Sequence, residues 1–228
     1  MRQRWDRLTF LHWQFEPEEV GRLLPPGLEP DLFGGAAWVG LVPFFMHVAT
    51  ASGRMLPWVS RFPETNVRTY VRNADGVTGI WFFSLDAARL GAVGVARSTY
   101  RLPYFWSLMR TEGGGAAGGE ISYACNRRLP GPAASSRVSV SIGDRISADE
   151  LDERDHFLTA RWILFSVAGS RRRLARARHE PWPLHRAEAT TVDDGLLVAA
   201  GLPAPVGAPL VHYSPGVDVA IGRPEKCR

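Results

Sequence analysis

Segments of strand-like composition run along most of the chain; some alternate apolar and polar positions, and others are apolar on both faces. The segments concerned are rich in aromatic and β-branched residues: 8–15, 28–50, 66–73, 79–87, 104–111, 121–128 and 137–144. Gly34-Gly35 and the stretch 73–76 (NADG) read as turns that close two successive hairpins. Segments 172–180 and 184–195 are predicted to form a last hairpin.

Helical signals are few and short. Pro17 and early acidic residues predict a short helix before the double proline at 25–26. Asp86 is predicted to cap a weak helix over 87–97. The best helix is expected over 147–162, where Ser147 and Glu150 have the spacing of a capping box. A last short helix is expected within 192–203.

No strand-helix-strand rhythm and no internal repeat appears, so the pattern predicts an α+β fold on a mostly antiparallel, barrel-like sheet with a few short helices. The chain has 228 residues, 45% of them hydrophobic, which suffices for a complete core. We expect a single domain over residues 5–221, followed by a tail over 222–228.

Charge changes this picture little. The chain carries 27 basic residues and a net charge of +4, yet Lys226 is the only lysine. The arginines are spread along the chain, whereas a nucleic-acid-binding surface gathers them on one face, so we expect no nucleic-acid partner. The densest run, 171–178, is read as a solvated strand face or rim, with an anionic partner as the alternative.

Compartment and partners follow from what the sequence lacks. Cys125 and Cys227 form no CxxC motif, which favours a reducing environment, and no run of about 20 apolar residues suggests a membrane span. The N-terminal residues have no apolar core of a signal peptide. We therefore expect a cytoplasmic protein without a membrane partner, and leave self-association open.

Familiar catalytic motifs are missing. The six histidines form no HxH or HExxH pattern, and no GxSxG elbow is present, so neither a metal site nor a serine nucleophile is predicted. Cys125 reads as a small buried hydrophobic residue. No cofactor is expected.

Segment 60–73 (SRFPETNVRTYVRN) holds the strongest candidate site. In an extended strand four polar residues fall on one face: Glu64, Asn66, Arg68 and Tyr70. They line a ligand cavity or, alternatively, the exposed face of an ordinary sheet. The neighbouring segment 79–87 is apolar on both faces, which indicates a covered sheet and favours the cavity. A buried Glu beside an Arg could be an acid/base pair or a structural ion pair.

Three further candidate residues lie beside prolines that fix the backbone. His185 and Arg186 follow the stretch Pro181–Leu184, and His212 precedes Pro215. We expect His185 and His212 to lie close together at one mouth of the barrel; the alternative is that both sit on surface corners. His156, beside Phe157 on the predicted helix, is read as a packing residue.

Several long motifs resemble a known family: LHWQFEPEEVGRLLPPGLEPDLFGGAAWVGLVPF, FPETNVRTYV, WFFSLDAARL, LPYF, HFLTARW, PWPLHRAE and HYSPGVDV. Together they are similar to the DUF2071 (YqjF-like) family of the acetoacetate decarboxylase-like superfamily. The resemblance implies a cone-like antiparallel β-barrel around a small cavity, and it likens Glu64 to the cavity glutamate of the decarboxylases.

The resemblance fails at the lysines with which such decarboxylases form a Schiff base. The similar segment here is LPYFW, with Tyr104 and Phe105 where lysines would stand, and Lys226 lies in the tail. We therefore expect a lyase, isomerase or hydrolase that acts on a carbonyl- or carboxylate-containing metabolite without an imine. Glu64, Arg68 and Tyr104 are the predicted catalytic residues, and a list of ligand-binding residues completes the site: Asn66, Tyr70, His185, Arg186 and His212. The alternative is a non-catalytic binder or sensor that keeps the cavity.

Overall fold

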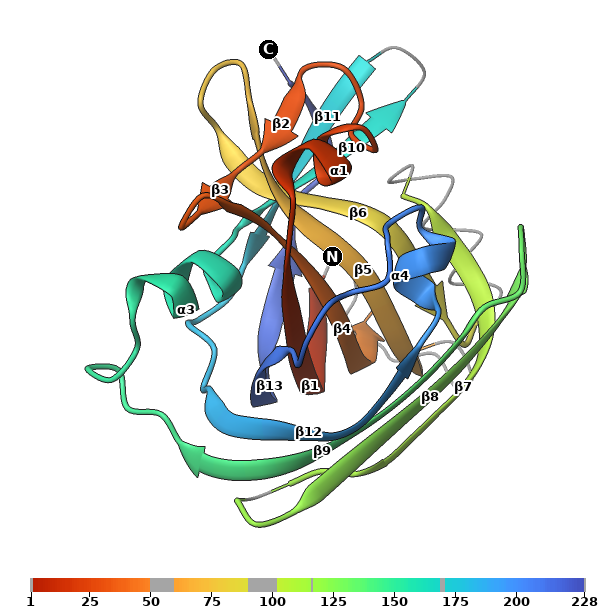
Figure 1. Cartoon of the computed structure of the whole chain (residues 1–228), viewed down its shortest axis with the longest axis vertical. Helices are drawn as coiled ribbons and strands as arrows, with labels where there is room; N and C mark the ends of the chain where they lie inside the picture. The colour runs from red at the N-terminus through yellow and green to blue at the C-terminus, as the bar shows by residue number, and fades with distance from the viewer. Residues whose placement is uncertain (1, 50–59, 90–101, 116, 169–170, 228) are drawn as a thin grey trace.

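The fold is built almost entirely from strands. The structure is a computed structural model that describes residues 2–49, 60–89, 102–115, 117–168 and 171–227 (Figure 1). Its strands are β1 (Arg2–Phe15), β2 (Leu28–Pro30), β3 (Leu32–Phe33), β4 (Ala36–Ala49), β5 (Arg61–Asn73), β6 (Thr78–Ala87), β7 (Tyr104–Gly113), β8 (Glu120–Leu129), β9 (Ser135–Arg145), β10 (Ile163–Ala168), β11 (Arg171–Arg178), β12 (His185–Asp194), β13 (Leu210–Ile221) and β14 (Glu225–Lys226). Its helices are α1 (Pro17–Gly21), α3 (Glu153–Thr159) and α4 (Leu196–Ala199).

The strands form one sheet that closes on itself twice. Strand β6 is connected to β13 by three hydrogen-bonded routes: through β5, β4 and β1, through β10 and β11, and through β7, β8, β9 and β12. Most neighbours are antiparallel, whereas β6 pairs in parallel with both β7 and β10. The expected mostly antiparallel, barrel-like sheet is confirmed, and β5, β4 and β1 form a central wall inside it (Figure 1).

Both faces of the central wall are buried, because a core lies on each side. The α3-side core includes Phe10, Val42 and Tyr70, together with Leu158 of α3 and Ala177 of β11. The β8-side core contains the residues that alternate with those of the wall, among them Leu11, Leu41 and Val67, and side chains of β8, β9 and α4. Two-sided burial explains the long apolar stretches in β1 and β4.

The predicted hairpins around Gly34-Gly35 and around residues 73–76 are confirmed, since β3 pairs with β4 and β5 with β6. Helix α3 is shorter than expected. It begins at Glu153, because Asp152 and Asp155 form the capping box, while Ser147 and Glu150 hydrogen-bond to each other in the preceding turn.

Two predictions about local structure are wrong. Segments 172–180 and 184–195 are not hairpin partners: β11 pairs with β10, β13 and β14, and β12 pairs with β9 and β13. Asp86 lies inside β6 and bonds Arg127, so it does not cap a helix there. Residues 90–97 of the predicted helix lie outside the described residues.

The tail contributes a short strand, since β14 pairs with β11 through Arg173 and Lys226. Among the described residues, none of the helices is long and apolar enough to cross a membrane.

Candidate functional site

The predicted row on β5 points into the α3-side core. Strand β5 pairs with β6 from Glu64 to Arg72, and the one register shift falls between Val67 and Arg68. Phe62, two residues before the row, and Tyr70, its last member, belong to the α3-side core, whereas Val67 belongs to the other core. The expectation that Glu64, Asn66, Arg68 and Tyr70 share one face of a strand paired with 77–85 is therefore confirmed.

All four side chains of the row are buried, with 0–6% of their surface exposed. This excludes the alternative of a solvated sheet face. Polar groups removed from water need hydrogen-bond partners, and a buried charge needs compensation. The partners of each group therefore indicate what the row can do.

Glu64 is held by a tyrosine. The Tyr104 hydroxyl at the start of β7 donates a hydrogen bond to Glu64 Oε2 at 3.1 Å. Burial raises the pKa of the Glu64 carboxyl to about 8, against the opposing effect of the Tyr104 hydrogen bond and with a further increase from the charge of Asp86. At neutral pH the carboxyl is mostly protonated and can donate a proton.

Arg68 belongs to a row of directly paired residues that crosses strands β5, β4 and β1. His12 of β1 pairs with Gly40 of β4, and Gly40 pairs with Arg68. A Cβ atom at Gly40 would stand 3.0 Å from the His12 ring, so glycine at this position leaves room for the imidazole. The Arg68 guanidinium lies over the Phe10 ring, 5.2 Å from its centroid.

A hydrogen-bonded chain connects His12 with helix α3. The Tyr70 hydroxyl donates to the Leu158 carbonyl at 2.5 Å, and His12 Nε2 lies 2.7 Å from the same hydroxyl. Because the hydroxyl proton is used by Leu158, His12 Nε2 donates and its Nδ1 is left as an acceptor. Burial, and the charges of Arg68 and His212, hold the pKa of His12 well below its usual value, so the ring is neutral.

The C-terminal candidates separate onto two faces. Arg186 pairs with His212, and His185 pairs with Tyr213 of the β8-side core. His212 Nε2 lies 3.2 Å from Asp155 Oδ1 of α3, and Arg186 forms an exposed ion pair with Glu150. The expected proximity of His185 and His212 is confirmed along the backbone, because their strands are neighbours.

Their expected convergence on one site is wrong for His185. Directly paired residues of adjacent strands project to the same face. His185 therefore shares a face with Tyr213, and its Nδ1 lies 3.1 Å from the Gly143 carbonyl. His212 faces the α3-side core, where the charges of His12 and His212 influence each other.

Four buried polar atoms facing the α3-side core have no hydrogen-bond partner among the described residues: Asn66 Oδ1, Arg68 Nε, His12 Nδ1 and His212 Nδ1. Arg68 also forms no ion pair with any carboxylate in the part of the chain that the structure describes. Buried groups of this kind are rare in native proteins unless a ligand or water satisfies them. This set, with Glu64 and Tyr104, is called the Arg68 cluster below.

Glu64 and Arg68 do not form the pair that their spacing suggested. Four residues of strand separate their Cα atoms by roughly 13 Å at about 3.3 Å per residue. The neutral acid and the guanidinium can therefore contact different ends of one small molecule. Asn66 lies between them on the same face.

His12 and Asp155 were missed by the sequence reasoning. His12 carried one signal, an ionisable residue between Leu11 and Trp13 in a strand that is apolar on both faces. Asp155 carried none, because its contact with His212 joins residues 57 positions apart. No group of three or more His, Cys, Asp or Glu side chains is placed to hold a metal ion within the described ranges.

Comparison with known proteins places this geometry in a family. The model of the DUF2071 family, described as uncharacterised conserved proteins, matches residues 2–218. The chain belongs to the DUF2071 family. A further member, the uncharacterised protein YqjF of Bacillus subtilis, is 34% identical over 220 residues, which cover 96% of this chain and 89% of YqjF.

Solved structures show the same fold at low sequence identity. The enduracididine biosynthesis enzyme MppR in complex with pyruvate superposes with a TM-score of 0.68 at 15% identity, covering 99% of this chain and 89% of MppR. An acetoacetate decarboxylase-like enzyme from Sphingomonas wittichii gives 0.68 at 12% identity, covering 100% and 92%. The acetoacetate decarboxylase of Legionella pneumophila gives 0.66 at 9% identity, covering 100% and 88%.

The one lysine of this DUF2071 protein is remote from the Arg68 cluster. Lys226 is exposed on β14, where it pairs with Arg173 of β11. The position that resembled the lysine stretch of the decarboxylases is occupied by Tyr104, whose hydroxyl bonds Glu64.

Proposed function

We propose that this DUF2071 protein binds a small metabolite with a carboxylate or carbonyl group at the Arg68 cluster and acts on it as a lyase, isomerase or hydrolase. The observation that carries the proposal is the buried Arg68 guanidinium, which has a free Nε and no carboxylate partner among the described residues. A bound carboxylate would supply the missing charge and accept from Nε. Pyruvate in the related MppR fold is a ligand of this chemical class.

The proposed chemistry is general acid and base catalysis. Arg68 holds the anionic or carbonyl oxygen, and neutral Glu64 donates a proton, with Tyr104 fixing the carboxyl group. No imine is involved, because Lys226 lies on the surface at β14. If Glu64 is the acid, turnover falls as the pH rises through about 8, where the carboxyl loses its proton.

A ligand screen tests the binding step. Keto acids, β-dicarbonyls and polyketide-like acids are added to the protein and the thermal midpoint is recorded. A ligand at 100 times its dissociation constant stabilises the folded state by about 2.7 kcal/mol. The wild type and an Arg128→Gln control, which changes an exposed arginine of β8, should respond alike, whereas Arg68→Met should lose the shift.

The second candidate is a non-catalytic binder or sensor. It is supported by the same free polar atoms together with the lack of an interior lysine, since both leave a binding site without the amine of the decarboxylases. NMR of the bound compound over hours separates the candidates: new signals that depend on Glu64 indicate an enzyme, and an unchanged ligand indicates a binder. If no compound shifts the midpoint of the wild type and Arg68→Met is less stable than the control, the cluster is structural.

A further inference from the structure

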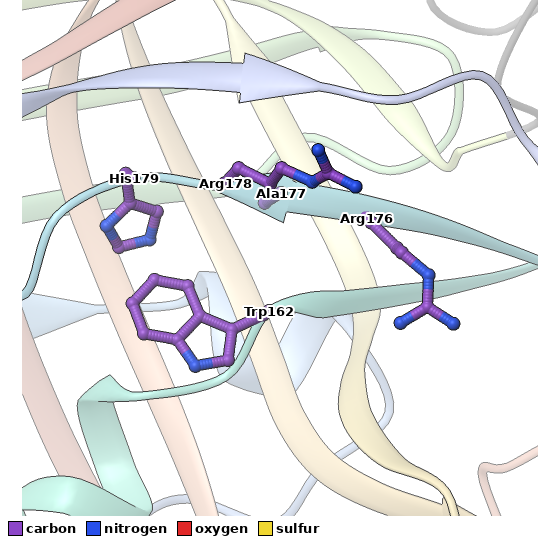
Figure 2. A pocket seen from close by; sticks show the side chains of 5 residues that line it. All are labelled: Trp162, Arg176, Ala177, Arg178 and His179. Carbon is purple, nitrogen blue, oxygen red and sulfur yellow. The ribbon is translucent and has the colours of Figure 1, made fainter.

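A pocket at the edge of the α3-side core, to which its residue Ala177 contributes, has a different chemical character from the Arg68 cluster. It has a volume of about 440 Å³ and is lined by Trp162, Arg176, Ala177, Arg178 and His179 (Figure 2). Small-molecule sites have volumes of this order, from about 300 Å³ upward. None of the pocket residues belongs to the Arg68 cluster.

The backbone around this pocket is fixed by strand pairing. The pocket lies where β11 leaves β10 and joins β13: Arg176 pairs with Ile163, and Arg178 pairs with Ala220. The Ala177 amide donates to the Trp162 carbonyl at 2.8 Å, which ties the two walls together. The walls are therefore formed before any ligand arrives.

Aromatic rings form one side of the pocket. The His179 ring lies 4.3 Å from the Trp162 ring and 4.9 Å from that of Trp182, measured between centroids. The rings are tilted against each other, by 56° and 60°; Trp182 is buried and anchors this ring cluster, whereas Trp162 keeps 37% of its surface exposed. An exposed indole on a rigid support offers a planar face for stacking.

Positive charge forms the other side. Arg176 and Arg178 are exposed, alternate on the same face of β11, and form no ion pair with a carboxylate of the described residues. Figure 2 shows the Trp162 and His179 rings beside each other, with the Arg178 and Arg176 side chains extending away from them along opposite edges of the β11 ribbon. Glu180 is the nearest acid in sequence, and its backbone carbonyl accepts from His179 Nδ1. Guanidinium groups prefer the oxygens of carboxylates and phosphates, which they bind in bidentate fashion.

We propose that this pocket is a second ligand site, which binds a planar aromatic ring that carries an anionic group, either a carboxylate or a phosphate. The ring stacks on the exposed face of Trp162, and the anion contacts Arg176 and Arg178. The site goes beyond the proposed function, because it uses none of the residues that hold the metabolite at the Arg68 cluster.

Calorimetric titration with indole-3-acetate tests the proposal, with AMP as the phosphate probe. Indole-3-acetamide removes the charge, and cyclohexaneacetate removes the aromatic ring. We expect the wild type to bind indole-3-acetate or AMP at least tenfold more tightly than either of these analogues. The tighter binder of the two shows whether the site prefers a carboxylate or a phosphate.

Variants locate the binding. The double variant Arg176→Gln/Arg178→Gln should weaken anion binding at least tenfold and leave the acetamide unaffected, and Trp162→Ala should weaken both. The matched control is Arg128→Gln, again an exposed strand arginine. All four substituted side chains are exposed, and an unchanged thermal midpoint shows that the variants fold.

Two results would overturn the proposal. One is a wild type that binds neither indole-3-acetate nor AMP at millimolar concentrations. The other is equal affinity in the wild type and the double arginine variant, together with loss of binding in Arg68→Met, which would place the compound in the Arg68 cluster. The Arg68 variant also separates this proposal from the proposed function. Arg68→Met should lose metabolite binding and keep the binding of indole-3-acetate or AMP, and the double arginine variant should do the reverse.

Discussion

Glu64 is a carboxylic acid in a place that favours its neutral form. Burial raises its pKa to about 8, from an unfolded value near 4.5. Between these two values the folded state binds more protons than the unfolded state, so the free energy of unfolding falls as the pH rises. The limiting slope for one group is about 1.4 kcal/mol per pH unit.

Replacing Glu64 by Gln should remove this dependence. The amide has nearly the same shape and no titration, so the Glu64→Gln variant should gain stability relative to the wild type as the pH increases from 5 to 8. Urea unfolding at pH 5, 6, 7 and 8 measures the difference. Parallel stability curves for the two proteins would show that Glu64 titrates normally.

A single methyl group added at Gly40 is predicted to disturb the Arg68 cluster. Its Cβ would stand 3.0 Å from the His12 ring, which the Tyr70 hydroxyl holds in place. Overpacking of this kind costs about 1–3 kcal/mol. We expect Gly40→Ala to lose that much stability in urea unfolding.

A second variant checks the cause. In a His12→Ala background the obstructing ring is absent, so Gly40→Ala should cost much less than it does alone. Equal costs in the two backgrounds would mean that the methyl group conflicts with something other than the imidazole.

Residue patterns predicted the row on β5 but not its surroundings. Alternation is local, so Glu64, Asn66, Arg68 and Tyr70 could be assigned to one face from sequence alone. The positions of His12 and Asp155 depend on strand register and on the docking of α3, which are set by contacts distant in sequence. For the same reason the proline signals near His185 did not reveal that it faces the other core.

At the scale of elements, one buried ion pair joins three strands. Arg127 of β8 donates to both carboxylate oxygens of Asp86 of β6, at 2.8 and 2.6 Å, and Ser107 of β7 donates to Oδ1 at 2.7 Å. The two charged side chains are 1% and 0% exposed. The Arg127 guanidinium also lies 3.9 Å from the centroid of the Phe105 ring.

Removing the arginine should be costly. The Arg127→Met variant leaves the Asp86 carboxylate buried without its counter-charge, and such losses amount to about 3–5 kcal/mol. Urea unfolding of this variant is compared with that of Arg128→Gln, the next arginine along β8, which is exposed. If both variants lose equally little stability, the ion pair does not support the junction of β6, β7 and β8.

The same ion pair explains an error made from sequence. Asp86 precedes small residues that read as a weak helix, and an aspartate there resembles an N-cap. In the fold Asp86 bonds Arg127, which is 41 residues away in sequence, and no local sequence pattern predicts that pairing. Strand existence, two hairpins and the fold class were accessible from sequence because they depend on near neighbours, whereas the partners of β11 and β12 were not.

At the scale of the whole molecule, the distribution of amines limits the chemistry. Lys226 is the chain's one lysine and is exposed on β14. We expect borohydride treatment with acetoacetate or a related keto acid to leave the intact mass unchanged. A reduced adduct on Lys226 would contradict this and would favour imine chemistry.

The central wall of β5, β4 and β1 couples the unfolding of the two cores. Each wall strand contributes alternate residues to the two cores, so it cannot leave one of them and remain docked in the other. Loss of either core should therefore proceed as one cooperative transition. Trp182 reports on the α3-side core and Trp13 on the β8-side core. In protein labelled with 5-fluorotryptophan, their fluorine resonances should show the same urea midpoint, and two separate midpoints would mean that the shared wall does not couple the halves.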